Sequence, residues 1–484
     1  MEVCIVGGGF CGIVSSRVAL DNGFIPFVLN TSSKIGGLWN PGPSQNSTWD
    51  SLHLNGSKHM AAISDLYWPN TDHIIPPSSE FKQYLLNYID KHNLSQYFHN
   101  NCTVTLIERQ HPGYLVTWKS GTHSETKYFG HVIIANGRFN QAFNNIPIQK
   151  DFKSKVVYSG EYREPSIFAG KKVVIVGKSV SGSEIALDAI RTAEKVTQVW
   201  RSKYIVVPKM LNGMPYDFFF NKIENFSLYR HFTNFPDVVI QNQARLLKFV
   251  GNPGKILKEW EISESELETK GQHGQQACSN GYIDAVKANK IHCVQGNVKY
   301  LSKSSVHLES GEDLEADVVV ICTGYTANFD FLSQEIKGII EYDKNNKLLP
   351  YVAYRRVLHP KLPGLGFIGF MFGASGRYEL QAEIIMKKFA GKLLVSDVEL
   401  WQGVNMEQWM RISLKGYYAS YDPFGYLKEC LRILRSPVNL DMIRGKHNFS
   451  GGIYAPYFLF SDRKGQDQVY QEFIKDLRSR DPKL

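Results

Sequence analysis

Three glycines near the start of the chain have the spacing of a phosphate-binding turn. Gly7, Gly9 and Gly12 follow the apolar run VCIV, and a helical pattern comes after them. In a G-x-G-x-x-G turn the first glycine permits the tight turn, the second lets a pyrophosphate approach the backbone, and the third lets the helix pack closely on the sheet. The free N–H groups at the start of the helix then hold the phosphates. An ordinary glycine-rich loop is the alternative, so the interpretation depends on the flanking strand and helix.

A second turn of the same kind lies in the stretch VVIVGKSVSGSEIA. Gly177 and Gly182 keep the outer positions, and Ser179 replaces the middle glycine. A serine is small enough for close approach of a ligand to the backbone, and its hydroxyl can donate a hydrogen bond to a phosphate. The chain therefore has two candidate dinucleotide sites.

The residues after the next strand of the second unit indicate which dinucleotide binds there. Arg201, Ser202 and Lys203 follow the run VTQVW, where a site for NAD would have an acidic residue. Basic residues suit the 2′-phosphate of NADPH, and the planar guanidinium of Arg201 can bind it with two hydrogen bonds. A solvated charge at a strand end is the alternative, more so for Lys203 than for Arg201. One dinucleotide in the first site and NADPH in the second indicate a flavoprotein in which NADPH reduces FAD.

In the first unit Asn30 occupies the position where a carboxylate would bind the ribose hydroxyls. Asparagine offers one carbonyl acceptor and an amide donor, and these neutral hydrogen bonds are weaker than those of a carboxylate by about 1 kcal/mol. We therefore expect FAD to bind at this site and to dissociate more readily than from a site with an acid.

Parallel strands and helices must position these turns. Four β-branched runs end in glycine, and each is continuously apolar, as is typical of strands buried on both faces of a parallel sheet. These runs are VCIVGGG, VIIANG, KVVIVGKS and DVVVICTGY. Helices are predicted at 9–22 and 181–193.

The predicted fold class is α/β, with two dinucleotide-binding, Rossmann-like domains. We expect the FAD-binding domain to comprise residues 1–150 and 317–484. The NADPH-binding domain, at 151–316, is inserted in it and contains an aromatic, loop-rich insertion at about 210–290.

The composition is that of a globular protein. The 484 residues are 43% hydrophobic and 21% charged, and the Lys and Arg residues behind the net charge of +9 are scattered, which argues against nucleic acid as a partner. No window approaches the roughly 18 apolar residues of a transmembrane helix. The seven cysteines include no CxxC pair and no metal-ligand spacing, so we expect a reducing, cytoplasmic location and no metal site. A homodimer is compatible with the sequence.

Several separate motifs resemble those of one enzyme family. IGGLW at Ile35–Trp39 and DSLHLNGSKHM at Asp50–Met60 follow the first unit, CTGYTANFDFL resembles a motif at the exit of the second domain, and LHPKLPGLGFIGF with ELQAE resembles the segment that returns to the flavin. On these residues the chain resembles the flavin-containing monooxygenases, which are class B flavoprotein monooxygenases, as far as about Tyr457. The resemblance implies FAD and NADPH as cofactors and O₂ as cosubstrate. It also implies that a C4a-hydroperoxyflavin oxygenates the nucleophilic nitrogen or sulfur of a small-molecule amine or sulfide, giving N-oxide formation or S-oxygenation.

The resemblance further implies roles for individual residues. The asparagine matched by Asn55 lies beside the flavin in the family and helps to hold the peroxide, so Asn55 is the catalytic candidate. Gln381 is expected near the isoalloxazine ring, partly through its backbone. Together, the turns and family motifs give these cofactor-binding candidates: Gly7, Gly9, Phe10, Cys11, Gly12, Asn30, Gly37, Leu38, Trp39, Asn55, Ser57, Gly177, Ser179, Ser181, Gly182, Arg201, Ser202, Thr323, Gly324 and Gln381.

The family's identifying motif, F-x-G-x-x-x-H followed by three residues and Tyr or Phe, is matched in part by FKSKVVYSGEY. Phe152 and Tyr162 agree, whereas Ser154 replaces the glycine and Tyr158 the histidine. Baeyer–Villiger enzymes of the same class would end the motif with Trp-Pro. The pair Tyr162-Arg163 therefore favours oxygenation of a heteroatom.

Three alternatives stay open. Val180, in place of the family's asparagine, together with Tyr158 and Ser179 suggests an uncoupled NADPH oxidase that produces hydrogen peroxide. Baeyer–Villiger-type oxygenation is the second alternative, because the sequence says least about the substrate cavity. The third is a non-enzymatic nucleotide-binding sensor or scaffold, which Asn30 and Ser179 motivate.

Overall fold

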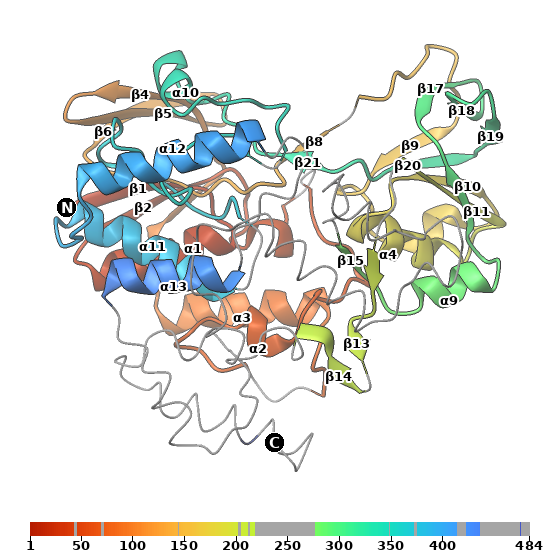
Figure 1. The fold of residues 1–484 in the computed structure, drawn as a ribbon, viewed down its shortest axis with the longest axis horizontal. Helices are drawn as coiled ribbons and strands as arrows, with labels where there is room; N and C mark the ends of the chain where they lie inside the picture. The colour runs from red at the N-terminus through yellow and green to blue at the C-terminus, as the bar shows by residue number, and fades with distance from the viewer. Residues whose placement is uncertain are drawn as a thin grey trace.

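Two parallel five-stranded sheets organise the molecule, one in each half of Figure 1. The computed structural model describes residues 1–42, 46–68, 72–143, 145–201, 205–211, 213–217, 276–347, 349–371, 375–413, 423–435 and 475. The first sheet has the order β22-β7-β1-β2-β3 and the second β16-β11-β10-β20-β9, and the pairings within both are parallel. Their bounds are β1 (Glu2–Val6), β2 (Ile25–Asn30), β3 (Phe98–Asn100), β7 (Val132–Ile134) and β22 (Leu365–Phe367), then β9 (Lys155–Tyr158), β10 (Lys172–Val176), β11 (Lys195–Trp200), β16 (His292–Gln295) and β20 (Val318–Ile321).

The first sheet is buried on both faces because its central strands are mostly apolar, as in VCIV of β1 and VII of β7. Alternate side chains of a strand point to opposite faces. Val3 and Ile5 of β1 pack towards the helices, and Cys4 and Val6 pack towards an antiparallel three-stranded sheet. The helices are α1 (Phe10–Asp21), α3 (Ser78–Lys91), α11 (Ser375–Phe389) and α13 (Pro423–Leu434), and the antiparallel strands are β4 (Cys102–Gln110), β5 (Gly113–Ser120) and β6 (His123–Phe129).

The second sheet repeats this arrangement of layers. Val173 and Ile175 of β10 pack with the helices, whereas Val174 and Val176 pack towards a second antiparallel sheet. The helices are α4 (Val180–Ala189) and α9 (Tyr282–Lys287), and the antiparallel strands are β17 (Val298–Ser302), β18 (Ser305–Leu308) and β19 (Asp313–Glu315). The α/β fold with two Rossmann-like units, one inserted in the other, is confirmed.

Both predicted helices after the glycine turns are present. The helix predicted at 9–22 is α1, and Gly23, with φ +80°, follows it in a conformation that ends a helix. The helix predicted at 181–193 is α4, which ends at Ala189 because the chain turns there to enter β11.

The predicted second domain boundary needs a correction. Residues from 317 onward were assigned to the first unit, but β20 pairs with β10 and β9 of the second sheet. A continuous apolar run in the sequence fits a strand of either sheet. Only the pairing of β20 with β10 and β9 shows that it belongs to the second sheet. The chain crosses between the sheets before β9 and after β20, where the short strands β8 (Gln141–Ala142) and β21 (Tyr325–Thr326) pair at the centre of Figure 1.

The remaining elements complete the described structure. They are α2 (Lys58–Ala61), α10 (Gln334–Ile339), α12 (Asp397–Ser413), β12 (Ile205–Val207), β13 (Met210–Leu211), β14 (Met214–Pro215), β15 (Gln276–Cys278) and the 3₁₀ turns Gly37–Trp39, Ser95–Tyr97 and Pro165–Phe168. The centre of the predicted aromatic insertion, 218–275, lies outside the described residues. Within the described ranges, none of the helices is both long enough and apolar enough to cross a membrane.

Candidate active site

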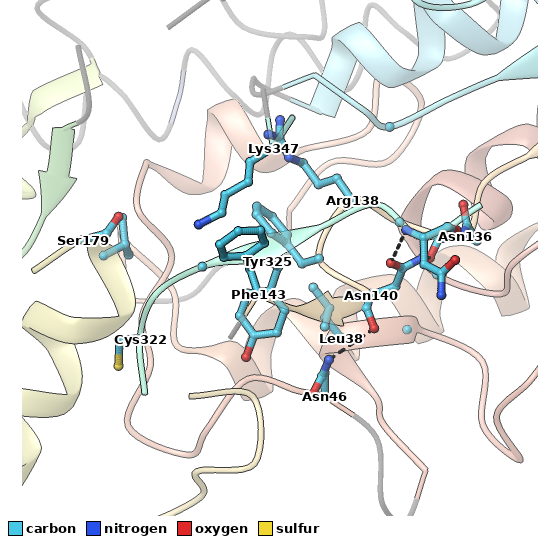
Figure 2. Close-up of a pocket in the computed structure, with 18 of the residues that line it drawn as sticks. Leu38, Asn46, Asn136, Arg138, Asn140, Phe143, Ser179, Cys322, Tyr325 and Lys347 are labelled. Carbon is cyan, nitrogen blue, oxygen red and sulfur yellow. Dashed lines mark hydrogen bonds between the residues drawn. The ribbon is translucent and has the colours of Figure 1, made fainter. Parts of the chain in front are cut away.

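One cavity of about 2680 Å³ receives the carboxyl ends of strands from both sheets. Val6 and Asn30 reach it from the first sheet, and Val176 and Trp200 reach it from the second. Parallel sheets bind ligands at this end of their strands. Because an ordinary small-molecule pocket holds roughly 300–1,000 Å³, the volume is sufficient for two extended dinucleotides. Part of the wall is drawn in Figure 2.

The first glycine turn has the geometry that its spacing predicts. Gly7 has φ +119°, and a Cβ there would lie 2.5 Å from the carbonyl oxygen of Ala135. A Cβ on Gly12 would collide with the carbonyl oxygen of Gly7, so Gly12 permits close packing and does not itself line the cavity. Phe10 and Cys11, the first residues of α1, do line it, and the first turn of the helix has no acid. The positive helix end therefore faces a space that fits a pyrophosphate.

The IGGLW segment closes one side of this turn. A Cβ on Gly37 would lie 2.8 Å from the Cα of Gly9, so these two glycines allow the segments to touch. Leu38 and Trp39 line the cavity, and the Trp39 ring meets Phe81 edge-on at 4.5 Å between centroids. Burial raises the pKa of the Cys11 thiol to about 12, which keeps this neighbour of the turn neutral.

Asn30 reaches the cavity, but its amide is engaged by the protein. Nδ2 donates to the side-chain oxygen of Asn100 (2.8 Å) and to the carbonyl oxygens of Lys34 (2.9 Å) and Ser32 (3.1 Å). Oδ1 accepts only a long bond of 3.4 Å from the Ser32 N–H among the described residues. The sequence predicts that both the donor and the acceptor of this amide bind the ribose hydroxyls. In the structure only the acceptor, Oδ1, is available for that interaction.

The second glycine turn has the same backbone geometry as the first. Gly177 has φ +111°, and a Cβ there would lie 2.5 Å from the carbonyl oxygen of Cys322. Gly182 packs behind it, against the Gly177 carbonyl, and neither Gly182 nor Ser181 lines the cavity. Ser179 does line it as the N-cap of α4, and its hydroxyl has no partner in the described part of the chain. That hydroxyl and the helix N-terminus fit a second pyrophosphate.

Cations surround the second turn. Arg201 is exposed at the cavity wall and pairs with no carboxylate of the described residues. Lys178, within the turn, is 2% exposed, its Nζ lies 3.6 Å from the Trp200 ring centroid, and burial lowers its pKa to about 7. Ser202 and Lys203 lie outside the described residues.

Asn55 lies on the cavity wall in a loop that is fixed from both sides. Its amide makes no hydrogen bond within the described structure, so it is available to a ligand. The Leu54 N–H donates to the carbonyl oxygen of Pro76 (2.9 Å). Residues that flank β13 and β14 make two further contacts with this loop. Asp217 Oδ2 accepts hydrogen bonds from the backbone N–H (2.8 Å) and hydroxyl (2.9 Å) of Ser57, and Lys209 Nζ donates to the carbonyl oxygen of His53 (3.1 Å).

The two segments that leave the sheets also line the cavity. Asn136, after β7, donates through Nδ2 to the carbonyl oxygen of Asn328 (2.8 Å), and its Oδ1 is buried without a partner among the described residues. Such an orphaned acceptor at a cavity wall fits a ligand with a hydrogen-bond donor. Thr323 and Gly324, after β20, also line the cavity, and the Thr323 hydroxyl donates to the carbonyl oxygen of Phe143.

The side chain of Gln381 does not reach the cavity, so the structure does not place this side chain where a flavin ring would contact it. It is 1% exposed, its Nε2 donates to the Tyr426 hydroxyl (2.9 Å), and its Oε1 accepts from the Gly369 N–H (3.1 Å). Gly369 itself lines the cavity, where a Cβ would lie 2.5 Å from Sγ of Cys11. Gln381 thus supports the wall from behind.

Four residues at or beside the cavity were not singled out from the sequence: Lys209, Asp217, Asn136 and Lys347. Single polar residues in loops have no characteristic spacing in the sequence. They can be recognised as site residues only because the fold brings them to one cavity. The sequence does contain a signal for Asn136, because the stretch ANG at 135–137 resembles CTG at 322–324, which belongs to the exit motif.

Two glycine turns on one cavity define an enzyme with two dinucleotide cofactors. Residues 1–429 match the flavin-binding monooxygenase-like family, and the chain belongs to it. It is a flavin-dependent monooxygenase that uses FAD and NADPH, which removes the non-enzymatic alternative.

Known relatives agree with this assignment. A flavin-containing monooxygenase 3 of Oryctolagus cuniculus is 28% identical over 400 residues, which are 76% of this chain and 70% of the relative. The structure of S-allyl-L-cysteine S-oxygenase from Allium sativum matches with a TM-score of 0.64 and 20% identity, over 99% of this chain and 98% of that chain. Cyclohexanone monooxygenase from Rhodococcus sp. Phi1, bound to NADP⁺, matches with a TM-score of 0.63 and 14% identity, over 90% and 97%. The two structures establish the shared fold alone.

Proposed function

We propose that this monooxygenase oxygenates a nucleophilic nitrogen or sulfur atom of a small molecule, with NADPH and O₂ as cosubstrates. The observation that supports this most is that both glycine turns and the unpaired amide of Asn55 lie on one cavity wall. Two observations favour a heteroatom over a ketone. The motif FKSKVVYSGEY ends in Tyr162-Arg163 and not in Trp-Pro, and the chain is similar to a flavin-containing monooxygenase 3.

The chain's own residues bind and orient the two dinucleotides and keep water away from the reacting atoms. The N–H groups at the start of α1 hold the FAD pyrophosphate, and those at the start of α4, with the Ser179 hydroxyl, hold that of NADPH. Arg201 binds the 2′-phosphate. Bound FAD supplies hydride acceptance and activation of O₂. Asn55 donates and accepts hydrogen bonds beside the reacting atoms, and the fixed loop around it limits access of water.

The test is NADPH and O₂ consumption by the FAD-loaded protein across tertiary amines, sulfides and ketones, with product analysis under ¹⁸O₂. We expect one labelled oxygen atom in an N-oxide or sulfoxide for each NADPH used. Peroxide formed in proportion to NADPH with every substrate would establish the uncoupled oxidase instead, and a labelled ester would establish Baeyer–Villiger oxygenation. Asn55→Ala should lower product relative to peroxide, with Asn46→Ala, at another part of the wall, as the matched control.

A cytoplasmic location and a homodimer are part of this proposal. None of the seven cysteines forms a disulfide in the described structure, which supports a reducing compartment. Fractionation of the source cells and light scattering of the purified protein test the location and the subunit number.

A further inference from the structure

Lys347 places a second cation on the wall of the NADPH half of the cavity. It comes from the segment between α10 and β22, outside the second sheet unit. Its Nζ donates to the carbonyl oxygen of Thr323 (2.9 Å) and lies 3.6 Å from the centroid of the Phe143 ring. Figure 2 shows the Lys347 side chain above Phe143 and Tyr325, with its ammonium pointing towards Ser179.

The charge of Lys347 is not neutralised in the described structure. Burial and, second, the positive charge of Arg201 lower the pKa of Lys347 to about 8. None of the ion pairs of the described residues includes Lys347. Two carboxylates of the cavity wall are engaged elsewhere, because Glu309 accepts from Asn297 (2.9 Å) and Asp343 pairs with Arg411 (3.6 Å). Two cations within range of each other's field, with no acid paired to either among the described residues, form an anion site.

The sheet order places the two cations on either side of the second glycine turn. Arg201 follows β11 directly, and the carbonyl that holds Lys347 lies two residues after β20. Since β10, which leads into the turn, lies between β11 and β20, a dinucleotide on the turn has a cation on each side.

We propose that Lys347 is a phosphate-binding and cofactor-selecting residue for NADPH, acting with Arg201 across the second glycine turn. This rests on the assignment of that turn to NADPH. The ligand is a phosphate group, either the 2′-phosphate or the pyrophosphate of the nicotinamide dinucleotide. A phosphate between the two cations removes their repulsion and restores the charge of Lys347. Because Lys347 belongs to a segment outside the inserted unit, its bond to the phosphate also ties the two units together.

The experiment is equilibrium binding of NADP⁺ and NAD⁺ to the oxidised, FAD-loaded full chain by calorimetry. Lys347→Gln keeps a donor for the Thr323 carbonyl and removes the charge, Lys347→Arg keeps the charge, and Lys344→Gln changes an exposed lysine of the same segment that does not line the cavity. We expect Lys347→Gln to raise the Kd for NADP⁺ about 10- to 100-fold. Lys347→Arg should restore most of the affinity, and Lys344→Gln should have no effect.

The NAD⁺ titration identifies the phosphate. An unchanged Kd for NAD⁺ in Lys347→Gln assigns Lys347 to the 2′-phosphate, and an equal rise assigns it to the pyrophosphate. A Kd for NADP⁺ that stays within twofold of wild type, with FAD content and melting temperature retained, overturns the inference. If Lys347→Gln does not fold, the pH dependence of NADP⁺ affinity decides in its place, because an arginine stays charged where a lysine of pKa about 8 loses its proton. Affinity that falls above pH 8 in wild type but not in Lys347→Arg supports the inference, and identical profiles overturn it. Because these isotherms need no turnover, failure of the proposed oxygenation would leave them unchanged.

Discussion

The hydrogen bonds between Asp217 and Ser57 should hold the Asn55 loop in place, and removing them should be costly. Both residues are buried, with Asp217 4% and Ser57 0% exposed, and Oδ2 of Asp217 accepts from the Ser57 backbone (2.8 Å) and hydroxyl (2.9 Å). A hydrogen bond to a charged group contributes about 1.5–3 kcal/mol, and a buried donor left unpaired costs about 1–3 kcal/mol. Because these terms overlap, Asp217→Ala should lower the free energy of unfolding by about 3 kcal/mol.

Two measurements check this prediction. Urea unfolding gives the stability, and the ratio of oxygenated product to NADPH consumed shows whether Asn55 remains in place. Asp217→Asn, which keeps an acceptor without the charge, should lose about 1 kcal/mol. Ser57→Ala removes only the hydroxyl bond and the helix cap that Ser57 gives to Met60, so a double-mutant cycle isolates the pair. If Asp217→Ala stays within 0.5 kcal/mol of wild type and keeps its product ratio, the contact does not position the loop.

Three further predictions follow from the cavity. Arg201→Ala should raise the KM for NADPH about tenfold or more while changing that for NADH little, and equal effects in steady-state kinetics would remove Arg201 from the 2′-phosphate. Asn30→Asp should lower stability by about 1–3 kcal/mol, because a carboxylate would face the oxygens of Asn100 and Lys34, and a raised melting temperature would contradict this. A bound phosphate should raise the pKa of Lys347 from about 8 towards the ordinary 10.5 of lysine, so binding takes up a proton and NADP⁺ affinity falls by up to about tenfold per pH unit above pH 8. Calorimetry from pH 7 to 10 checks this, and a pH profile that Lys347→Gln leaves unchanged would refute it.

The glycine turns and their helices could be predicted because they depend on neighbouring residues. Gly7 and Gly177 need a positive φ, and Gly12 and Gly182 need room next to a carbonyl of the same turn, so the requirement is present in a few consecutive residues. The strand after each turn follows from its continuous apolar run. The two Rossmann-like units were therefore predictable without an alignment.

The position of β20 and the partners of Asn30 could not be predicted in this way. The run VVVI of β20 fits either sheet, and its place between β10 and β9 is decided by pairing between segments far apart in the chain. Asn30 has the expected place at the end of β2, but the acceptor that engages its amide, Asn100, is brought there by the parallel pairing of β2 with β3.

The sequence by itself determined the two glycine turns, their order and the basic residue that follows β11, because each depends on a few consecutive residues. Tertiary structure decided what surrounds the ligands. It brought Asp217 from beyond the second turn to the Asn55 loop, withdrew the side chain of Gln381 from the cavity, and set Lys347 opposite Arg201. The first and third relations join residues separated by more than a hundred positions, and the second depends on Tyr426, which lies 45 positions from Gln381. Only the packing of these distant segments around one cavity makes them neighbours.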